Sequence, residues 1–285
     1  MNPYSCASFC AIHMNMNWIP KILIMLGMAV CPTLQAKEEG VSPGAVMLDI
    51  GHQPTAKGAQ SPDKKINEFD FWIKYAPFVR AEVESAGYRC IVTNRANAPK
   101  NHVGGDIVYM NKPDKNGKRY PSTHHPEHIG AGMICADYAI DIKARCVVFL
   151  HLNSTGNKWA TKPATGLIIY NKNNGKSFAE QLCQTMRSDI LDSPGGLSNG
   201  NKGIKAIPRF IGSQPSAGWM NTLDEENIPA IVFEALYVNN KKHAEYLQND
   251  KNARKLAQTI GKSIVLWLRA SGKNGGERRC VPRQR

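Results

Sequence analysis

The sequence lacks the marks of several large protein classes. It contains no CxxC pair, so a thiolate zinc ribbon and thioredoxin-like chemistry have no support. It has no arginine-rich helix, zinc-finger spacing or aromatic ribonucleoprotein motif, and we therefore expect no nucleic-acid partner. Internal repeats and a clear interdomain linker are also missing, which makes one domain the economical interpretation of 285 residues.

Negative charge is scarce in this chain. The 23 Asp and Glu residues face 36 Lys and Arg residues, which leaves a net charge of +13. Such a surface attracts polyanions at long range, whether nucleic acid, acidic lipid or an anionic cell-wall polymer, but it can equally serve solubility alone. Because the basic residues are spread through the chain, the charge indicates where the protein works rather than what it does.

No apolar run is long enough to cross a bilayer. The stretch "IPKILIMLGMAVC" at 19–31 has Lys21 near its start and is followed by "TLQA". This order predicts a secretory signal peptide over residues 1–36, cleaved after Ala36, with Met14 or Met16 as alternative start sites. We expect export to the periplasm or the extracellular cell envelope, without stable membrane insertion after cleavage; an uncleaved anchor is the alternative.

Cysteine usage after the leader leaves the redox state open. An oxidising compartment would permit up to two disulfides, and buried free thiols are an equal alternative, because spacing alone does not assign pairs. The cysteines concerned are Cys90, Cys135, Cys146, Cys183 and Cys280.

Strand-like and helix-like segments alternate after the leader. Apolar runs predict strands at 44–52, 88–95 and 166–171, and in "CVVFLH" and "IPAIVFE". Helical spacing predicts helices at 66–86, 131–143, 175–191, 240–248 and 251–270. This order is typical of an α/β domain with a twisted, mostly parallel or mixed sheet of about six strands flanked by helices.

The predicted catalytic domain covers residues 40–271. Within it, residues 96–130 are polar and rich in Asn, Lys, Pro and Gly, which predicts a long inserted loop. Residues 272–285 form a basic segment that we expect to be a flexible tail.

Three apolar strands end in ionisable residues. "MLDIGH" ends in His52, "VVFLH" in His151 and "AIVFE" in Glu234, while Glu68 lies at the start of the first predicted helix. In open α/β sheets ligands gather outside the carboxyl ends of the strands, so these four side chains are expected to converge.

Two imidazoles and a carboxylate with an open fourth position form a common catalytic zinc set. The hypothesis is that His52, Glu68 and His151 bind Zn²⁺, while Glu234 acts as general base and acid in the hydrolysis of an amide. Taken singly, each residue has an ordinary structural explanation, such as a turn cap or an ion pair with a lysine. The agreement of four positions on one site favours the metal hypothesis.

The ordered motifs "LDIGH", "NEFDFW", "TNR", "FLHLNS", "GLIIY" and "IPAIVFEALYVNN" resemble those of the zinc-dependent N-acetylmuramoyl-L-alanine amidases of the Amidase_3 type. The resemblance spans roughly residues 44–270. It implies zinc at His52, Glu68 and His151 and a catalytic Glu234. It also implies that the substrate is peptidoglycan, cut between the lactyl carbonyl of N-acetylmuramic acid and L-alanine of the stem peptide.

Other polar residues have weaker assignments. Asn153 and Arg209 are candidate substrate-binding residues, and the Arg209 guanidinium suits a stem-peptide carboxylate. The inserted loop carries "HHPEH" at 124–128, which could bind a metal; because Pro126 breaks any regular histidine face, a solvated loop is the favoured interpretation. A lid over the cleft is a further alternative for this loop.

Two other functions remain open from the sequence. A zinc peptidase of related architecture would keep the metal and act on another peptide, and a non-catalytic wall-binding regulator would keep the fold without turnover. A protein activator is considered as a further partner. Retention of Glu234 beside the predicted ligands argues against the regulator.

Overall fold

The computed structural model describes residues 44–94, 107–110, 121–128, 130, 132–161, 165–193, 197, 203–208 and 218–274. The strands are β1 (Val46–Ile50), β2 (Cys90–Asn94), β3 (Ile107–Tyr109), β4 (Cys146–Leu150), β5 (Gly166–Tyr170), β6 (Ile204–Pro208) and β7 (Ala230–Glu234). The helices are α1 (Glu68–Ser85), α2 (Met133–Asp141), α3 (Lys176–Met186), α4 (Gly218–Glu225), α5 (Lys241–Gln248) and α6 (Asp250–Asn274), and a π-helical turn, Arg187–Leu191, continues α3.

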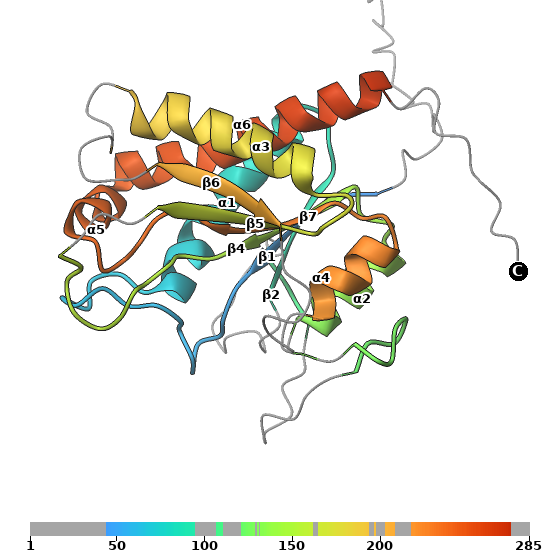
Figure 1. Cartoon of the computed structure of the whole chain (residues 1–285), viewed down its shortest axis with the longest axis horizontal. Coiled ribbons are helices and arrows are strands. Elements are labelled where there is room, and N and C mark those ends of the chain that lie inside the picture. The colour runs from blue at the N-terminus through green and yellow to red at the C-terminus, as the bar shows by residue number, and fades with distance from the viewer. Residues whose placement is uncertain are drawn as a thin grey trace, which may run out of the picture. The chain divides into compact units, whose positions relative to one another are not determined.

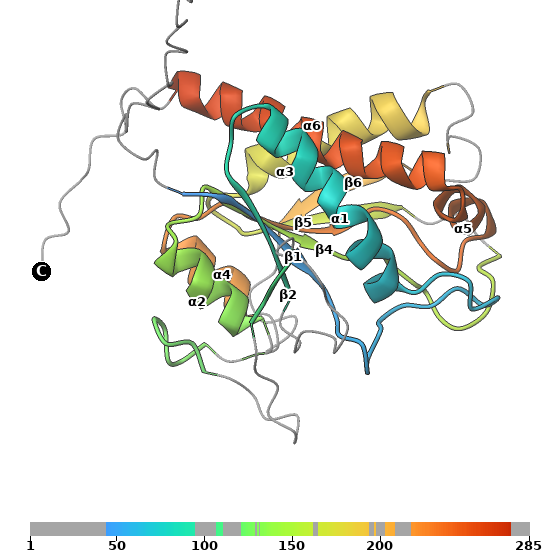
Figure 2. The ribbon, with the colours of Figure 1, turned by 180° about the vertical axis from the view of Figure 1, so that it is seen from behind.

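The seven strands form one mixed sheet in the order β3-β2-β1-β4-β7-β5-β6. All neighbours pair in parallel except β5 and β7, which are antiparallel, so β5 and β6 run against the other five strands. Helices α1, α3 and α6 cover one face of the sheet, and α2 and α4 cover the other (Figures 1 and 2). The expected α/β domain is confirmed, with seven strands where about six were predicted.

The alternating direction of side chains along the central strands explains why helices cover both faces of the sheet. Val46, Leu48 and Ile50 of β1 pack into the core beneath α1, α3 and α6, whereas Met47 packs into the core beneath α2 and α4. Successive side chains of a strand point to opposite faces, so a strand covered on both faces is apolar along most of its length, and the buried Asp49 is the exception in β1. The same requirement produces the continuous run "CVVFL" in β4, all of it buried.

Helix α1 begins where the sequence supplies a cap. The Asn67 side chain accepts a hydrogen bond from the Asp70 backbone N–H, which satisfies one of the free donors of the first turn. Phe69, Trp72 and Val79 are buried against the sheet, as their helical spacing predicts. The cap therefore fixes the position of Glu68, the first residue of the helix.

Several elements were not predicted from the sequence. Strand β3 lies inside the segment expected to be a loop, and β6 and α4 had no assignment. Strand β6 is an edge strand that contains Lys205 and ends at Pro208, so it lacks the apolar pattern of a central strand. Helix α6 ends at Asn274, which makes the first three residues of the expected tail helical.

No disulfide joins the cysteines that the structure describes. Cys90, Cys135, Cys146 and Cys183 are all buried and form no disulfide, so buried thiols are the correct alternative for these four. Burial raises the pKa of the Cys90 and Cys183 thiols to about 12, which keeps them protonated and unreactive.

Three predictions fall on residues that the structure does not describe: the leader at 1–36, the tail from 275 onward, including Cys280, and the substrate-binding role of Arg209. Among the described residues, no helix is both long enough and apolar enough to span a bilayer.

Candidate metal centre

The sheet brings three predicted site residues to one edge. Strand β4 lies between β1 and β7, with Leu150 opposite Ile50 on one side and Phe233 on the other. The residues that follow, Gly51, His151 and Glu234, therefore lie side by side at the carboxyl edge of the sheet. Because β1 has β2 on one flank and β4 on the other, this edge is also a switch point of the sheet, where α/β proteins place their ligands.

His52, Glu68 and His151 form a compact cluster at this edge. Their ligand atoms all lie within 4.8 Å of one another. His52 Nε2 lies 2.9 Å from Glu68 Oε2, and His151 Nδ1 lies 2.7 Å from Glu68 Oε1. The two imidazole rings meet edge-on, with centroids 5.2 Å apart. One ring nitrogen of each histidine thus faces the same carboxylate.

The carboxylate of Glu68 is buried and strongly held. Its Oε2 accepts the backbone N–H of Ala59 and its Oε1 that of Leu152, each at 2.9 Å. Burial would raise the pKa of Glu68, but the hydrogen bonds and charges of His151 and His52 outweigh it and lower the pKa to about 2. The cluster therefore contains a fixed negative charge, which a cation can neutralise.

Backbone geometry at His52 supports the same arrangement. His52 has φ of 68°, a left-handed conformation that is uncommon for residues other than glycine and often marks functional sites. The Asn94 side chain donates to the carbonyl oxygens of Ile50 and His52, at 2.7 and 3.0 Å. Asn94 thereby holds the end of β1 in this turn.

Two glycines leave the room that the cluster needs. A Cβ atom at Gly51 would collide with the His151 ring, and one at Gly58 would collide with Glu68 Oε2 and the His52 ring. Gly58 also has φ of +76°, which favours glycine on backbone grounds.

Glu234 lies beside the cluster at the end of β7. The His151 backbone N–H donates to the carbonyl oxygen of Phe233, the residue before Glu234. Asn153 Nδ2 donates to Glu234 Oε2 at 3.1 Å. Burial raises the pKa of Glu234 and Glu68 adds to this, although the charges of His151 and His52 oppose it. A partly buried carboxyl group with a raised pKa suits proton transfer.

The structure thus gathers His52, Glu68, His151 and Glu234, with Asn153 in contact with Glu234. Sequence reasoning missed Asn94 and the glycines. Their signals were present, because Asn94 follows a strand in "TNR" and Gly51 directly precedes His52. What those residues contact could not be read from the sequence.

The donor set fits a zinc-class ion. Two imidazole nitrogens and one carboxylate oxygen converge, and the side chains of His52 and His151 remain 34% and 16% exposed, which leaves the site accessible from solvent. An α/β sheet with this cluster at its carboxyl edge and a further carboxylate beside it has the construction of a metal-dependent hydrolase.

Comparison with known proteins identifies the family. The N-acetylmuramoyl-L-alanine amidase family called Amidase_3 matches residues 46–265, and the chain belongs to this family. The protein is accordingly a peptidoglycan hydrolase that cleaves between N-acetylmuramic acid and L-alanine of the stem peptide, which confirms the resemblance in the sequence motifs. No curated protein matches the sequence.

Solved structures share the fold at low sequence identity. The catalytic domain of the amidase CwlV from Bacillus (Paenibacillus) polymyxa is 18% identical, with a TM-score of 0.52 and coverage of 79% of this chain and 98% of that one. The amidase AmiC2 of Nostoc punctiforme is 18% identical, with a TM-score of 0.51 and coverage of 79% and 97%. The CwlD amidase from Clostridioides difficile, in complex with the GerS lipoprotein, is also 18% identical, with a TM-score of 0.51 and coverage of 80% and 99%.

Proposed function

We propose that this amidase is zinc-dependent, with His52, Glu68 and His151 as the protein ligands and Glu234 as the group that carries protons. The observation that supports this most is the convergence of the three ligand atoms within 4.8 Å at the carboxyl edge of the sheet. Zinc bound there supplies Lewis acidity, which polarises a carbonyl and lowers the pKa of a water molecule.

Glu234 is the proposed general base and acid. Because its pKa is raised, the Glu234 carboxylate is a stronger base than an exposed one. It can therefore take a proton from the attacking water and pass it to the leaving nitrogen of L-alanine. The hydrogen bond from Asn153 occupies Oε2 and fixes the carboxylate plane. Glu234 Oε1 is then the atom that we assign to the proton.

The remaining roles concern substrate, location and regulation. We propose that Asn153 also contacts substrate and that Arg209 binds a stem-peptide carboxylate. The predicted leader and the peptidoglycan substrate support export to the cell envelope. A protein activator is proposed as a partner, in line with the structure of the CwlD amidase in complex with the GerS lipoprotein.

A digestion experiment tests the metal and the bond together. The purified chain is incubated with peptidoglycan sacculi alone, after chelation, and after chelation followed by Zn²⁺ or Mg²⁺. We expect mass spectrometry to show free stem peptides and intact glycan strands, abolished by chelator and restored by Zn²⁺ alone. Release that persists in chelator would contradict the zinc proposal, and release from simple peptides but not from sacculi would favour a peptidase.

Glu234→Gln tests the proton-transfer role separately. The substitution keeps the shape and removes the titratable group, so we expect stem-peptide release to fall by about 10²–10⁴-fold. Zinc content should stay unchanged. Glu245→Gln, an exposed position on α5, is the matched control and should retain full activity. Unchanged release by Glu234→Gln would overturn the assignment.

A further inference from the structure

A second cluster of histidine and glutamate side chains lies away from the candidate metal centre. His125, Glu127 and His128 belong to the inserted loop, and Glu225 is the last residue of α4. Each offers one ligand atom, and these four atoms lie within 4.8 Å of one another. The His125 and His128 side chains are only 19% and 15% exposed. The two histidines are therefore half-buried, whereas His124, Pro126 and Glu127 of the same loop are exposed.

One nitrogen of each ring faces a shared pair of carboxylates. His125 Nδ1 lies 2.9 Å from Glu225 Oε2, and His128 Nε2 lies 3.6 Å from Glu225 Oε1. Glu127 Oε1 completes the group, at 3.7 Å from His125 Nδ1 and 4.0 Å from His128 Nε2. The two rings stack with an interplanar angle of 22° and a centroid separation of 5.6 Å.

The outer nitrogen of each ring has a separate partner. His125 Nε2 lies 3.1 Å from Glu226 Oε1, and His128 Nδ1 lies 2.7 Å from Thr222 Oγ1. Metal-binding histidines usually have such a carboxylate or other polar partner on the second nitrogen, because it fixes the ring orientation and the tautomer. Both rings are therefore oriented as metal ligands are, with the inner nitrogens left for an ion.

The loop that carries the two histidines is anchored to α2. Ser122 Oγ accepts the backbone N–H groups of His124 and His125 and donates to the buried carboxylate of Asp137. The Ser122 N–H donates to the His128 carbonyl oxygen at 2.8 Å. This bonding closes the loop on itself and holds His125 and His128 side by side.

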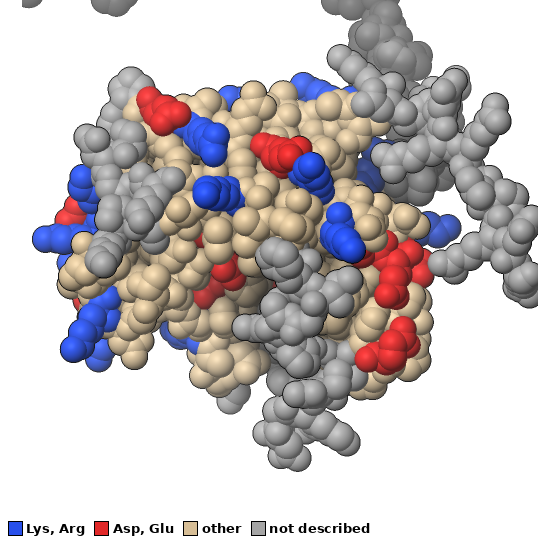
Figure 3. All heavy atoms as spheres, viewed as in Figure 1, with Lys and Arg blue, Asp and Glu red and all other residues tan. Residues whose placement is uncertain are grey.

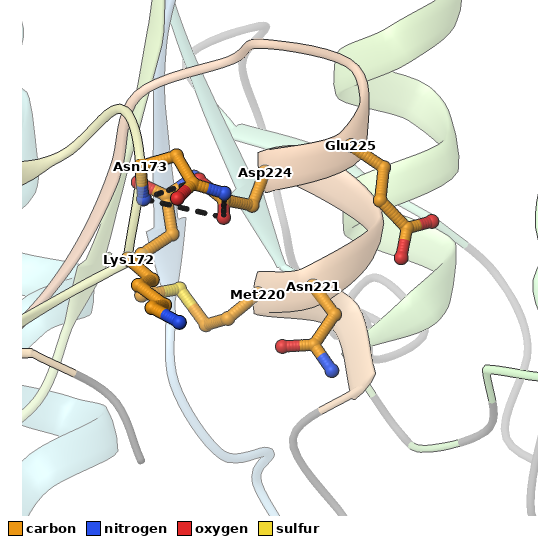
Figure 4. Close-up of a pocket in the computed structure, with 7 residues that line it drawn as sticks. Lys172, Asn173, Met220, Asn221, Asp224 and Glu225 are labelled. Atoms are coloured by element: carbon orange, nitrogen blue, oxygen red, sulfur yellow. Dashed lines mark hydrogen bonds between the residues drawn. The ribbon is translucent and has the colours of Figure 1, made fainter. Parts of the chain in front are cut away.

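Glu225 is directed to the loop by its place on α4. In Figure 4 its side chain lies on the other side of α4 from the hydrogen-bonded Asn173 and Asp224. That pair and Glu225 all line a cavity of about 180 Å³, and the Glu225 carboxylate also reaches the histidines.

The local charge favours a cation. Three carboxylates, from Glu127, Glu225 and Glu226, surround two imidazoles in a chain whose net charge is +13. Figure 3 shows acidic side chains gathered over this end of α4 and the adjacent loop.

We propose that His125, Glu127, His128 and Glu225 bind a second divalent transition-metal ion, of which zinc suits two imidazoles and two carboxylates best. The site is distinct from the one at the carboxyl edge, because Glu225 precedes the start of β7 whereas Glu234 ends that strand. Four protein ligands make a closed site, so its role is structural: it fastens the inserted loop to α4.

The test counts zinc in a chain that cannot bind it at the carboxyl edge. The untagged His52→Ala/His151→Ala variant is loaded with Zn²⁺, passed through a desalting column and analysed for metal. We expect about one zinc per chain to remain. Adding His125→Gln/His128→Gln to this background should remove it. His124→Gln is the matched control, because His124 pairs with Asp141 outside the cluster, and it should keep the ion.

A second readout guards against a folding defect. In the same background, Zn²⁺ should raise the melting temperature, and Glu225→Gln should greatly reduce that rise while leaving the melting temperature without metal nearly unchanged. Co²⁺ in place of Zn²⁺ should give the visible absorption of a four-coordinate site, lost in the Glu225→Gln chain. If the folded His52→Ala/His151→Ala variant retains no zinc and shows no thermal shift, the cluster is an ion-pair network and the proposal fails. These measurements involve no amidase activity, so their failure would leave the proposed function untouched.

Discussion

At the scale of single residues, Glu68 determines the electrostatics at the carboxyl edge of the sheet. Glu68 is 2% exposed, and its carboxylate accepts two backbone N–H groups besides facing two histidines. Leaving such a group buried and charged without partners would cost several kcal/mol, on the order of 3–5. The surrounding donors remove that cost before any cation arrives, so the three proposed ligands are already held in place.

Gly51→Ala tests this organisation without substituting any of the three proposed ligands. The added methyl group would collide with the His151 ring, and the ring must turn away from Glu68. We expect the affinity for Zn²⁺ at the catalytic edge to fall by roughly 10–100-fold, as for lost orienting contacts, with a matching loss of stem-peptide release at limiting zinc. Competition with a zinc-binding dye, in a His125→Gln/His128→Gln background, measures it.

The control for Gly51→Ala is a glycine with free space. Gly272 in α6 has no neighbour within 4 Å of an added Cβ. Gly272→Ala should leave zinc affinity and activity unchanged and raise helix stability by about 0.5–1 kcal/mol. Equal zinc affinity in Gly51→Ala and the parent chain would show that the His151 ring has more freedom than its packing indicates.

At the scale of secondary-structure elements, the sequence predicts best what is buried on both faces. Strands β1, β4 and β7 lie at the centre of the sheet, so each is a mainly apolar run that stops where the chain reaches the carboxyl edge; the buried Asp49 interrupts the run in β1. That is why the convergence of His52, His151 and Glu234 could be predicted from the sequence. Elements at the margin, such as β3 with three residues and α4 with eight, have too few buried positions for a periodic signal.

The sequence also gives no signal for contacts between segments that lie far apart along the chain. The pairing of His125 with Glu225 joins a loop to a helix 100 residues later, and neither segment carries a local sign of the other. Pro126 correctly argued against a helical histidine face. It gave no information about a histidine pair built by a serine-anchored turn, which is what the structure contains.

Helix α5 contains a buried histidine that should make folding pH-dependent. His243 is 1% exposed, and its Nδ1 accepts the Tyr237 backbone N–H at 3.0 Å. Burial lowers the pKa of His243 from 6.5 to about 4. The unfolded chain therefore takes up a proton first as the pH falls, and stability present above pH 6.5 is lost between there and about pH 4.

The contribution of His243 is measured by comparison with His243→Gln. Both proteins are unfolded in urea in the presence of chelator, at a series of pH values from about 7 to 4. We expect the free energy of unfolding of the parent chain to fall more than that of the variant, by on the order of 3 kcal/mol over this range. The carboxylates titrate in both proteins and cancel in the difference. Parallel pH curves would mean that His243 is protonated in the native state.

At the scale of the whole molecule, the net charge of +13 and the family's polymeric substrate make salt an informative variable. Attraction between a basic protein and an anionic wall acts over distances that salt screens, with a Debye length of about 10 Å at 0.1 M and 3 Å at 1 M. Contacts inside the catalytic site are much shorter and are screened less. Wall association and bond cleavage should therefore respond differently to salt.

The different salt responses of wall binding and bond cleavage test whether the positive net charge draws the protein to the wall. Co-sedimentation of the Glu234→Gln chain with sacculi should weaken several-fold as NaCl rises from about 0.05 to 0.5 M, because released counterions and screening both oppose binding. Cleavage of a small soluble muropeptide by the parent chain should change little over the same range. Sacculi stripped of anionic polymers serve as the control and should bind less, with a flatter salt dependence. Binding that is strong and independent of salt would mean that the basic surface serves solubility, and that short-range contacts with glycan and peptide account for association with the wall.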